Sequence, residues 1–182
     1  MSTAREALLA RARELMIDGQ WPKTPLAEVA ASAGVSRQTL YNEFGSREGL
    51  TAAVAQHTAD GFRAGTLAAA REHSDPVLAV TAAMLWALTT ASQDPLIKAG
   101  LTDDAAGLLP YLTNRSREIL LPVATGIATH LDRPGAEWAC EVALRMTVSH
   151  LLLPVTDDAS YVAAVGELIR PLFPEEEPAH GR

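Results

Sequence analysis

Cysteine and aromatic residues are scarce in this sequence. It contains one cysteine, Cys140, among 182 residues. A single thiol excludes an intramolecular disulfide and a metal site built from several thiolates. Chains without disulfides are typical of reducing compartments, so we expect a cytoplasmic protein. Aromatic residues make up 5 % of the chain, although 48 % of it is hydrophobic. The core must therefore be built mainly from alanine, leucine and valine, and alanine-rich segments favour helices.

Long apolar runs are also missing. The longest one, at about residues 79–91, contains threonines and is shorter than the roughly 20 residues that a membrane-spanning helix needs. We expect it to form a buried helix instead. The N-terminal segment carries charged side chains where a signal peptide would carry its apolar region: Arg5, Glu6, Arg11, Arg13 and Glu14. The sequence therefore predicts neither a membrane span nor a secretory leader.

Sequence patterns of catalytic sites are absent as well. There is no nucleophile elbow, no phosphate-binding glycine loop and no metal-ligand spacing. The five histidines do not pair at a separation of four residues: His57, His73, His130, His150 and His180. We therefore expect no enzyme activity, no cofactor and no metal. A site that the fold assembles from distant residues is the alternative that the patterns leave open.

The charge of the chain is unevenly distributed. Its formal net charge is −7, which by itself argues against a nucleic-acid partner. Residues 1–50, however, contain six basic and six acidic side chains, whereas residues 51–182 contain nine basic and sixteen acidic ones. Since only one surface has to meet a polyanion, the net charge of the whole chain does not exclude DNA binding.

Glycine, proline and helix-capping residues divide the chain into about nine helical segments, and no segment alternates like a β-strand. The sequence therefore predicts an all-α fold. Thr3 and Ser36 stand at N-cap positions, and Thr24 precedes Pro25 as the N-cap of another helix. Gly34 supplies the positive φ that ends the second helix. The expected helices cover about residues 3–18, 25–33, 36–44, 47–73, 76–92, 95–101, 110–131, 135–153 and 158–173, with a loop at 102–109 and an acidic tail at 174–182 for which we expect disorder.

A short helix, a glycine turn and a second helix with a polar outer face occupy residues 25–44, which is the helix-turn-helix pattern. The spacing predicts one buried cluster formed by Leu9, Leu15, Met16, Val29, Ala30, Ala33, Val35, Leu40 and Phe44. It turns five polar side chains toward solvent: Arg37, Gln38, Thr39, Tyr41 and Asn42. Arginine suits guanine in the major groove, and glutamine and asparagine suit adenine. A polar helix face usually meets only water, however, so the pattern alone leaves both interpretations open.

The residue types in this segment are more specific than the pattern. The motif A-x-x-A-G-V-S-R-x-T-L-Y-x-x-F-x-S-R-E-x-L runs from Ala30 to Leu50 and resembles the DNA-binding segment of the TetR/AcrR family of bacterial transcription regulators. The resemblance implies a helix-turn-helix DNA-binding domain at residues 1–46. It also implies a helical ligand-binding and dimerisation domain at residues 47–173, which matches the family only in its layout.

The resemblance assigns roles to individual positions. It implies that Arg37, Gln38, Thr39, Tyr41 and Asn42 contact bases and phosphates, and that Thr24, Ser36 and Arg47 bind phosphates. Gln38 replaces a glycine that is common in the family, and it adds a side chain that could read a base. Glu43 stands where the family often has His or Tyr. A carboxylate facing phosphate is unfavourable, so Glu43 turns away, accepts from a cytosine amine or pairs with Arg47 four residues later. We expect the pairing with Arg47.

The resemblance further implies a cavity among the helices of residues 47–153. The candidate lining residues are Phe62, Met84, Trp86, Leu88, Tyr111, Trp138, Met146 and His150. Methionine and tryptophan suit adaptable apolar sites, so we expect a small, mainly hydrophobic effector. Ordinary core packing is the alternative for each of these residues, and a core hydrogen bond is a further alternative for His150.

The last two helices resemble the family's dimer interface. Their apolar residues exceed what two terminal helices need to cover a core: Trp138, Val142, Leu144, Val148, Leu151, Leu152, Val162, Val165, Leu168 and Ile169. Pairing with a second chain would form a four-helix bundle, and a two-fold dimer would bind a palindromic operator. The sequence thus predicts a homodimeric transcription regulator, a repressor as is usual in the family, that an effector releases from DNA. The alternative is a helical small-molecule-binding protein without DNA binding.

Overall fold

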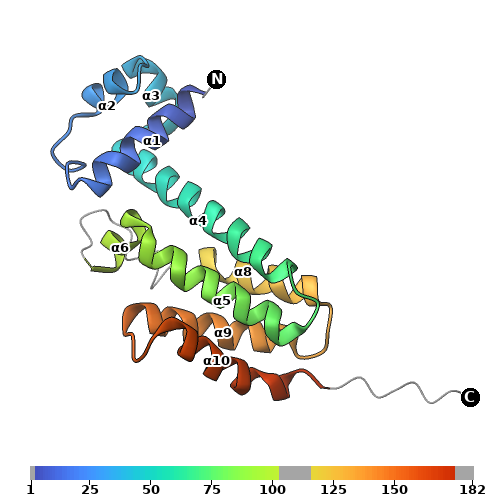
Figure 1. Ribbon diagram of the computed structural model, residues 1–182. Coiled ribbons are helices and arrows are strands. Elements are labelled where there is room, and N and C mark those ends of the chain that lie inside the picture. Colours follow the sequence, from blue (N-terminus) through green and yellow to red (C-terminus); the bar gives the residue numbers. More distant parts are fainter. Residues whose placement is uncertain (1–2, 103–115, 175–182) are drawn as a thin grey trace, which may run out of the picture. The chain divides into compact units, whose positions relative to one another are not determined.

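A computed structural model describes residues 3–102 and 116–174 of the chain (Figure 1). Every regular element in these ranges is helical, so the predicted all-α fold is confirmed. The elements are α1 (Ala4–Ile17), α2 (Leu26–Ser32), α3 (Arg37–Phe44), α4 (Arg47–Arg71), α5 (Pro76–Gln93), α6 (Pro95–Thr102), α8 (Ser116–Leu131), α9 (Ala136–Leu152), α10 (Asp158–Ile169) and the 3₁₀ turn η2 (Arg170–Leu172). The loop expected after residue 102, the helix start expected at residue 110 and the acidic tail lie outside the described residues.

Packing divides the chain into two compact units. Unit 1 consists of Met1–Gly61 with Ala91–Ser116, and unit 2 consists of Phe62–Thr90 with Arg117–Arg182. α4 and α5 each contribute to both units. The boundary expected after residue 46, between a DNA-binding domain and a ligand-binding and dimerisation domain, stays a prediction.

The core of unit 1 joins α1, α2, α3, the first half of α4 and the start of α6. Its buried residues are Leu8, Leu9, Ala12, Leu15, Met16, Trp21, Val29, Ala30, Leu40, Leu50, Val54, Ala55 and Leu96, and Ala33, Val35 and Phe44 pack against them. The predicted cluster of the helix-turn-helix is therefore confirmed. The sequence pattern does not predict that Trp21 and Leu96 join this core, as they do in the structure. The ion pair between Arg13 and Asp94, at 2.6 Å, fastens α1 to the beginning of α6 beside Leu96.

The ends of the first three helices follow local rules with one exception. Thr3 caps α1 in a reciprocal arrangement with Glu6. Gly34 has a φ of 71°, as the helix stop after α2 requires. The expectation that Thr24 caps α2 is wrong, because the helix begins at Leu26 and Pro25 occupies the N-cap position without a side-chain bond. The Thr24 hydroxyl instead donates to the Gln20 carbonyl at 3.0 Å.

The core of unit 2 is built largely from small residues. Its buried members are Ala70, Ala79, Val80, Ala83, Met84, Leu88, Val123, Ala124, Ile127, Ala128, Ala136, Ala139, Cys140, Ala143, Val162, Val165 and Ile169. The many alanines let helices approach closely, which explains how a core forms with few aromatic residues. By length and composition α5 would also pass as a membrane span, as core helices of soluble proteins do. Its buried face lies in this core, as the sequence predicts.

Candidate nucleic-acid interface

The candidate interface begins with the N-terminal cap of α3. The backbone N–H of Thr39 donates to Ser36 Oγ at 3.0 Å, and the two hydroxyls lie 2.8 Å apart. This confirms Ser36 as the N-cap and fixes Thr39 against the first turn. The first turn of α3 contains no acidic residue, so the positive end of the helix is not neutralised within it. A phosphate contact at Ser36 or Thr39 stays a prediction.

The outer face of α3 carries the side chains that the sequence singled out. Arg37, Gln38, Tyr41 and Asn42 are exposed, Thr39 is half-buried, and Leu40 is fully buried between them and the core. The expected orientation of the helix is therefore confirmed for four of the five polar residues. Their contacts with bases and phosphates stay predictions.

Two contacts between neighbouring turns order this face. Gln38 Nε2 donates to Asn42 Oδ1 at 2.8 Å. The Arg37 guanidinium lies over the Tyr41 ring, 5.4 Å from its centroid, so it is attracted to the ring while its N–H groups keep their capacity to donate. Both pairs are four residues apart and run along the helix axis. The α3 surface thus presents two ordered columns of polar groups.

Glu43 does not pair with Arg47, and this part of the sequence interpretation is wrong. Glu43 Oε2 lies 3.3 Å from Arg5 Nη1, and the Arg5 guanidinium also lies over the Phe44 ring, 4.7 Å from its centroid. The rule for residues four apart on one helix fails because Gly45 ends α3 before Arg47. A residue from the start of α1 therefore provides the positive charge beside the Glu43 carboxylate.

The Arg47 side chain binds the loop between α1 and α2. Its guanidinium donates to the carbonyl oxygens of Trp21 and Thr24 and lies over the Trp21 ring, 4.7 Å from the centroid. The Trp21 indole N–H in turn donates to Thr51 Oγ1 at 3.1 Å. This network ties the loop to the start of α4. The predicted phosphate contacts of Thr24 and Arg47 are not tested by it, and sequence reasoning missed the role of Trp21.

The start of α4 carries its own cap. Ser46 Oγ accepts from the backbone N–H of Gly49 at 3.1 Å. The pKa of Glu48 is lowered, first by a hydrogen bond with its own backbone N–H and then by one with Ser46. Glu48 is therefore ionised at neutral pH, where its charge favours the helix N-terminus.

The effector-site candidates separate into several environments. Met84 and Leu88 are buried in the core of unit 2, and Met146 is partly buried against it. Phe62 and Trp86 are half-buried and meet edge to face, with ring centroids 5.5 Å apart. The predicted position Tyr111 lies outside the described residues, and Trp138 is 60 % exposed on this chain. Their roles in binding an effector stay predictions.

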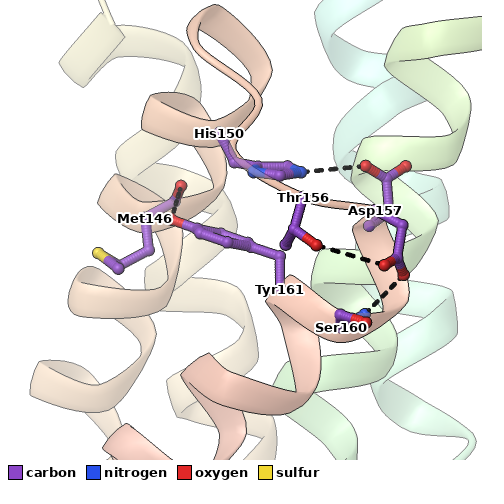
Figure 2. Close-up of polar contacts among 7 residues, drawn as sticks. Met146, His150, Thr156, Asp157, Ser160 and Tyr161 are labelled. Carbon is purple, nitrogen blue, oxygen red and sulfur yellow. Dashed lines mark hydrogen bonds and ion pairs between the residues drawn. The ribbon is translucent and has the colours of Figure 1, made fainter.

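His150 is held in a small polar cluster at the end of α9 (Figure 2). Its Nε2 lies 3.2 Å from Asp158 Oδ1 at the start of α10, and its ring stacks on Tyr161 with centroids 3.9 Å apart. Tyr161 Oη donates to the Met146 carbonyl at 3.0 Å. This arrangement matches the core hydrogen bond considered for His150, although within residues 3–102 and 116–174 its buried Nδ1 has no hydrogen-bond partner. Among the described residues, no three His, Cys, Asp or Glu side chains are grouped to hold a metal.

Comparison with known proteins decides the family. The family model described as bacterial regulatory proteins, tetR family, matches residues 8–54. The model described as the bacterial tetracyclin repressor C-terminal domain matches residues 75–171, which is more than half of the chain. The chain belongs to the TetR family. Its α1–α3 segment is therefore the helix-turn-helix DNA-binding domain of a TetR-family transcriptional regulator, and the expected family is confirmed.

Individual relatives agree with this assignment. The HTH-type transcriptional regulator AlkX of Mycobacterium tuberculosis is 28 % identical, over 92 % of this chain and 83 % of the relative. The solved TetR-family repressor AlkX from Dietzia sp., implicated in biodegradation of n-alkanes, is 26 % identical, with a TM-score of 0.68 over 93 % of this chain and 94 % of that one. RolR in complex with resorcinol shares the fold, with 18 % identity, a TM-score of 0.60 and coverage of 98 % and 96 %. TetR-family members and these relatives are regulators rather than enzymes.

Proposed function

We propose that this TetR-family protein is a cytoplasmic, ligand-responsive repressor that binds a palindromic operator as a homodimer. The observation that carries the proposal is the outer face of α3. Its exposed arginine, glutamine and asparagine stand on a capped helix directly after the Gly34 turn. These are residue types that donate to, or pair with, base edges in the major groove, and the helix presents them away from its own core.

The proposed dimer is supported by exposed apolar side chains on α9 and α10. Trp138, Leu152 and Leu168 are 60 %, 47 % and 58 % exposed on this chain. All three lie on the helices expected to form the interface, where contact with a second chain would remove their apolar surface from water. Three residues of the expected interface, however, are buried in the core of their own chain: Val162, Val165 and Ile169. We therefore assign the dimer contact to the exposed subset, and a two-fold axis then requires a palindromic operator.

The effector is proposed to be a small, mainly hydrophobic molecule. Phe62, Trp86 and Met146 are apolar side chains of unit 2 that are only partly buried, and such side chains suit an adaptable apolar site. The relative from Dietzia sp. is implicated in biodegradation of n-alkanes, which makes straight-chain aliphatic compounds the first class to test. An effector releases the operator only if it binds the DNA-free conformation more tightly than the DNA-bound one.

The alternative of a helical binding protein without DNA affinity has lost its main support. It rested on Glu43, whose carboxylate would repel phosphate. Arg5 lies 3.3 Å from that carboxylate, so the local charge is compensated. We therefore retain a single proposed function.

The test is a binding titration of the full-length protein with the duplex upstream of its own gene. A repressor binds it with an affinity that falls steeply between low and moderate salt, because binding releases counterions. A scrambled duplex of equal length is the control for sequence preference. Straight-chain alkanols, with resorcinol for comparison, are then added to the complex. Binding that does not distinguish the two duplexes refutes the proposal, and binding that no apolar compound reverses refutes its effector part.

A further inference from the structure

His150 has one ring nitrogen with a partner and one without. The side chain is 1 % exposed, and its Nε2 lies 3.2 Å from Asp158 Oδ1 (Figure 2). Its Nδ1 is buried, and no atom of the described residues forms a hydrogen bond with it. Both residues belong to unit 2, at the end of α9 and the start of α10. Unit 2 therefore contains a buried polar atom that its own packing does not use.

The contact with Asp158 decides which nitrogen of His150 carries the hydrogen. A carboxylate accepts hydrogen bonds and donates none, so the imidazole Nε2 has to be the donor. A neutral imidazole has one N–H group, which leaves Nδ1 as an acceptor with a single lone pair. The charged form, with hydrogens on both nitrogens, would leave a charged N–H group buried without a partner, which is costly. Nδ1 therefore requires a hydrogen-bond donor.

The hydroxyl groups beside the ring do not supply this donor. Tyr161 stacks on the imidazole with ring centroids 3.9 Å apart, but its hydroxyl donates to the Met146 carbonyl at 3.0 Å. Thr147 is buried one helical turn before His150, and its hydroxyl donates to the Ala143 carbonyl at 2.8 Å. Each hydroxyl has one hydrogen, and the backbone of α9 uses both. Since an unpaired buried acceptor is costly, a molecule that donates to Nδ1 gains free energy on binding.

A water molecule is the simplest donor, but the site suits it poorly. Buried waters typically form about three hydrogen bonds, whereas here the neighbouring hydroxyls have already donated their hydrogens. Met146, Leu151 and Tyr161 also pack against the apolar core of unit 2. A molecule with one hydroxyl and an apolar body needs a single polar bond and can place the rest of its surface among apolar side chains.

We infer that His150 binds the hydroxyl group of an apolar alcohol, which donates to Nδ1. The inference rests on the proposed function and deepens it, because it names the functional group of the effector and the atom that binds it. It separates compounds that share one carbon skeleton. An alcohol donates to Nδ1, whereas a ketone or an ionised carboxylate only accepts, and an alkane does neither.

The experiment measures binding to the full-length protein without DNA. Alkanols from 2-hexanol to 2-dodecanol are titrated beside the 2-alkanones of equal length, with calorimetry as the readout. For the pair that binds best, we expect the alcohol to bind about 5- to 150-fold more tightly, because the ketone leaves Nδ1 without a donor. In His150→Phe, which keeps an aromatic ring beside Tyr161, both members should bind alike. Equal affinities in the unsubstituted protein, or no binding by any alkanol, overturn the inference.

Asp158 is a positioning residue, because it acts on the ligand only through the imidazole. In Asp158→Asn the amide can either accept from Nε2 or donate to it, so the ring can adopt the tautomer that suits the ligand. We expect this variant to lose most of the preference for alcohol over ketone. An unchanged preference would mean that the tautomer does not select the ligand, and it would overturn the inference.

Asp157→Asn is the matched control. It removes the same charge one position earlier, and asparagine can accept from the Ser160 N–H as Asp157 does at the N-cap of α10. The preference for alcohol should equal that of the unsubstituted protein. A loss as large as in Asp158→Asn would trace the effect to charge at the start of α10 and count against the inference.

Nitrogen NMR tests the atom itself. In protein with isotope-labelled histidine, the His150 signals are those that vanish in His150→Phe. We expect a hydrogen on Nε2 and none on Nδ1 in the free protein, and the best-binding alkanol, unlike its ketone, should shift the Nδ1 resonance. A hydrogen on Nδ1 in the free protein overturns the inference. So does an alkanol that binds without shifting this resonance, since it then binds elsewhere.

The operator experiment separates this inference from the proposed function. An alkanol that binds at Nδ1 without releasing the operator supports the site and refutes its role as the effector site. Release of the operator by alkanols and alkanones alike supports the proposed function and overturns the inference.

Discussion

Arg47 lies over the indole ring of Trp21, 4.7 Å from its centroid, and donates to the Trp21 carbonyl oxygen. A second N–H group of Arg47 donates to the Thr24 carbonyl. Both acceptors belong to the loop that joins α1 to α2. The guanidinium therefore links this loop to the start of α4. Its planar group can donate to two carbonyl oxygens while it stacks on an aromatic ring.

Arg47→Lys should destabilise the fold. Lysine carries its donors on one tetrahedral nitrogen instead of a planar fork, so it cannot reproduce the guanidinium's contacts with both carbonyl oxygens. It also stacks poorly on the indole. We expect the free energy of unfolding to fall by about 2–3 kcal/mol, measured by urea denaturation. Arg37→Lys is the matched control, since Arg37 is exposed on α3 and its replacement should change stability by less than about 0.5 kcal/mol. Unaltered stability in Arg47→Lys together with weaker operator binding would instead assign Arg47 to the phosphate backbone.

Glu43→Gln should tighten operator binding. The substitution removes a negative charge from the end of α3 and frees Arg5, whose ion pair with Glu43 is substantially exposed. Its loss should cost less than about 1 kcal/mol of stability, whereas an extra uncompensated cation steepens the salt dependence of DNA affinity. Fluorescence anisotropy of a labelled operator at two salt concentrations measures the affinity and its salt dependence.

Weaker binding by Glu43→Gln would contradict this expectation. It would indicate that the carboxylate accepts a hydrogen bond from a cytosine amine, and the loss would then be confined to one base position. Arg5→Gln provides the complement, because it leaves Glu43 uncompensated and should weaken binding to all sequences alike.

Local rules made most of the DNA-binding domain predictable. The positive φ of Gly34, the hydroxyl cap of Ser36 and the buried Leu40 depend on residues within a few positions of each other. Such features are set by backbone geometry and helical periodicity, so the sequence was sufficient to place α2 and α3 and to orient the outer face of α3.

The contacts that the sequence did not predict join residues that are far apart in the chain. Arg5 and Glu43 are 38 residues apart, and Arg13 and Asp94 are 81 apart, so no local spacing rule relates them. Trp21 was missed because the course of the α1–α2 loop decides what its ring meets. Apolar periodicity alone also cannot separate a helix face that covers its own core from one that meets a partner. For that reason the sequence predicts Val162, Val165 and Ile169 at the dimer interface, whereas the structure buries them in the core of unit 2.

His150→Phe should be tolerated far better than His150→Ala. Phenylalanine keeps the stack on Tyr161 and removes the unpartnered Nδ1, while Asp158 is partly exposed and can turn to water. Alanine leaves a cavity and should cost about 3 kcal/mol or more. Thermal unfolding measures both variants. If the Phe variant is as stable as the parent but no longer responds to effectors, the imidazole binds the effector; an unimpaired response assigns it to packing.

The Cys140 thiol should be inert in the folded protein. Cys140 is buried in the core of unit 2, and this burial raises its pKa from 9.0 to about 12. Since only the thiolate is nucleophilic, a thiol reagent at pH 8 should react slowly with the native chain and rapidly in urea.

The same pKa shift makes stability depend on pH. The unfolded thiol ionises above its own pKa while the folded thiol stays neutral, so the contribution to stability is complete below pH 9 and is lost as the pH rises toward 12. The slope attributable to Cys140 should approach about 1.4 kcal/mol per pH unit in this interval. Urea denaturation at several pH values, with Cys140→Ala as the reference, isolates it from the titration of lysine and tyrosine. Equal slopes for the two proteins would mean that the thiol is accessible to water, and rapid labelling of the native chain should then accompany them.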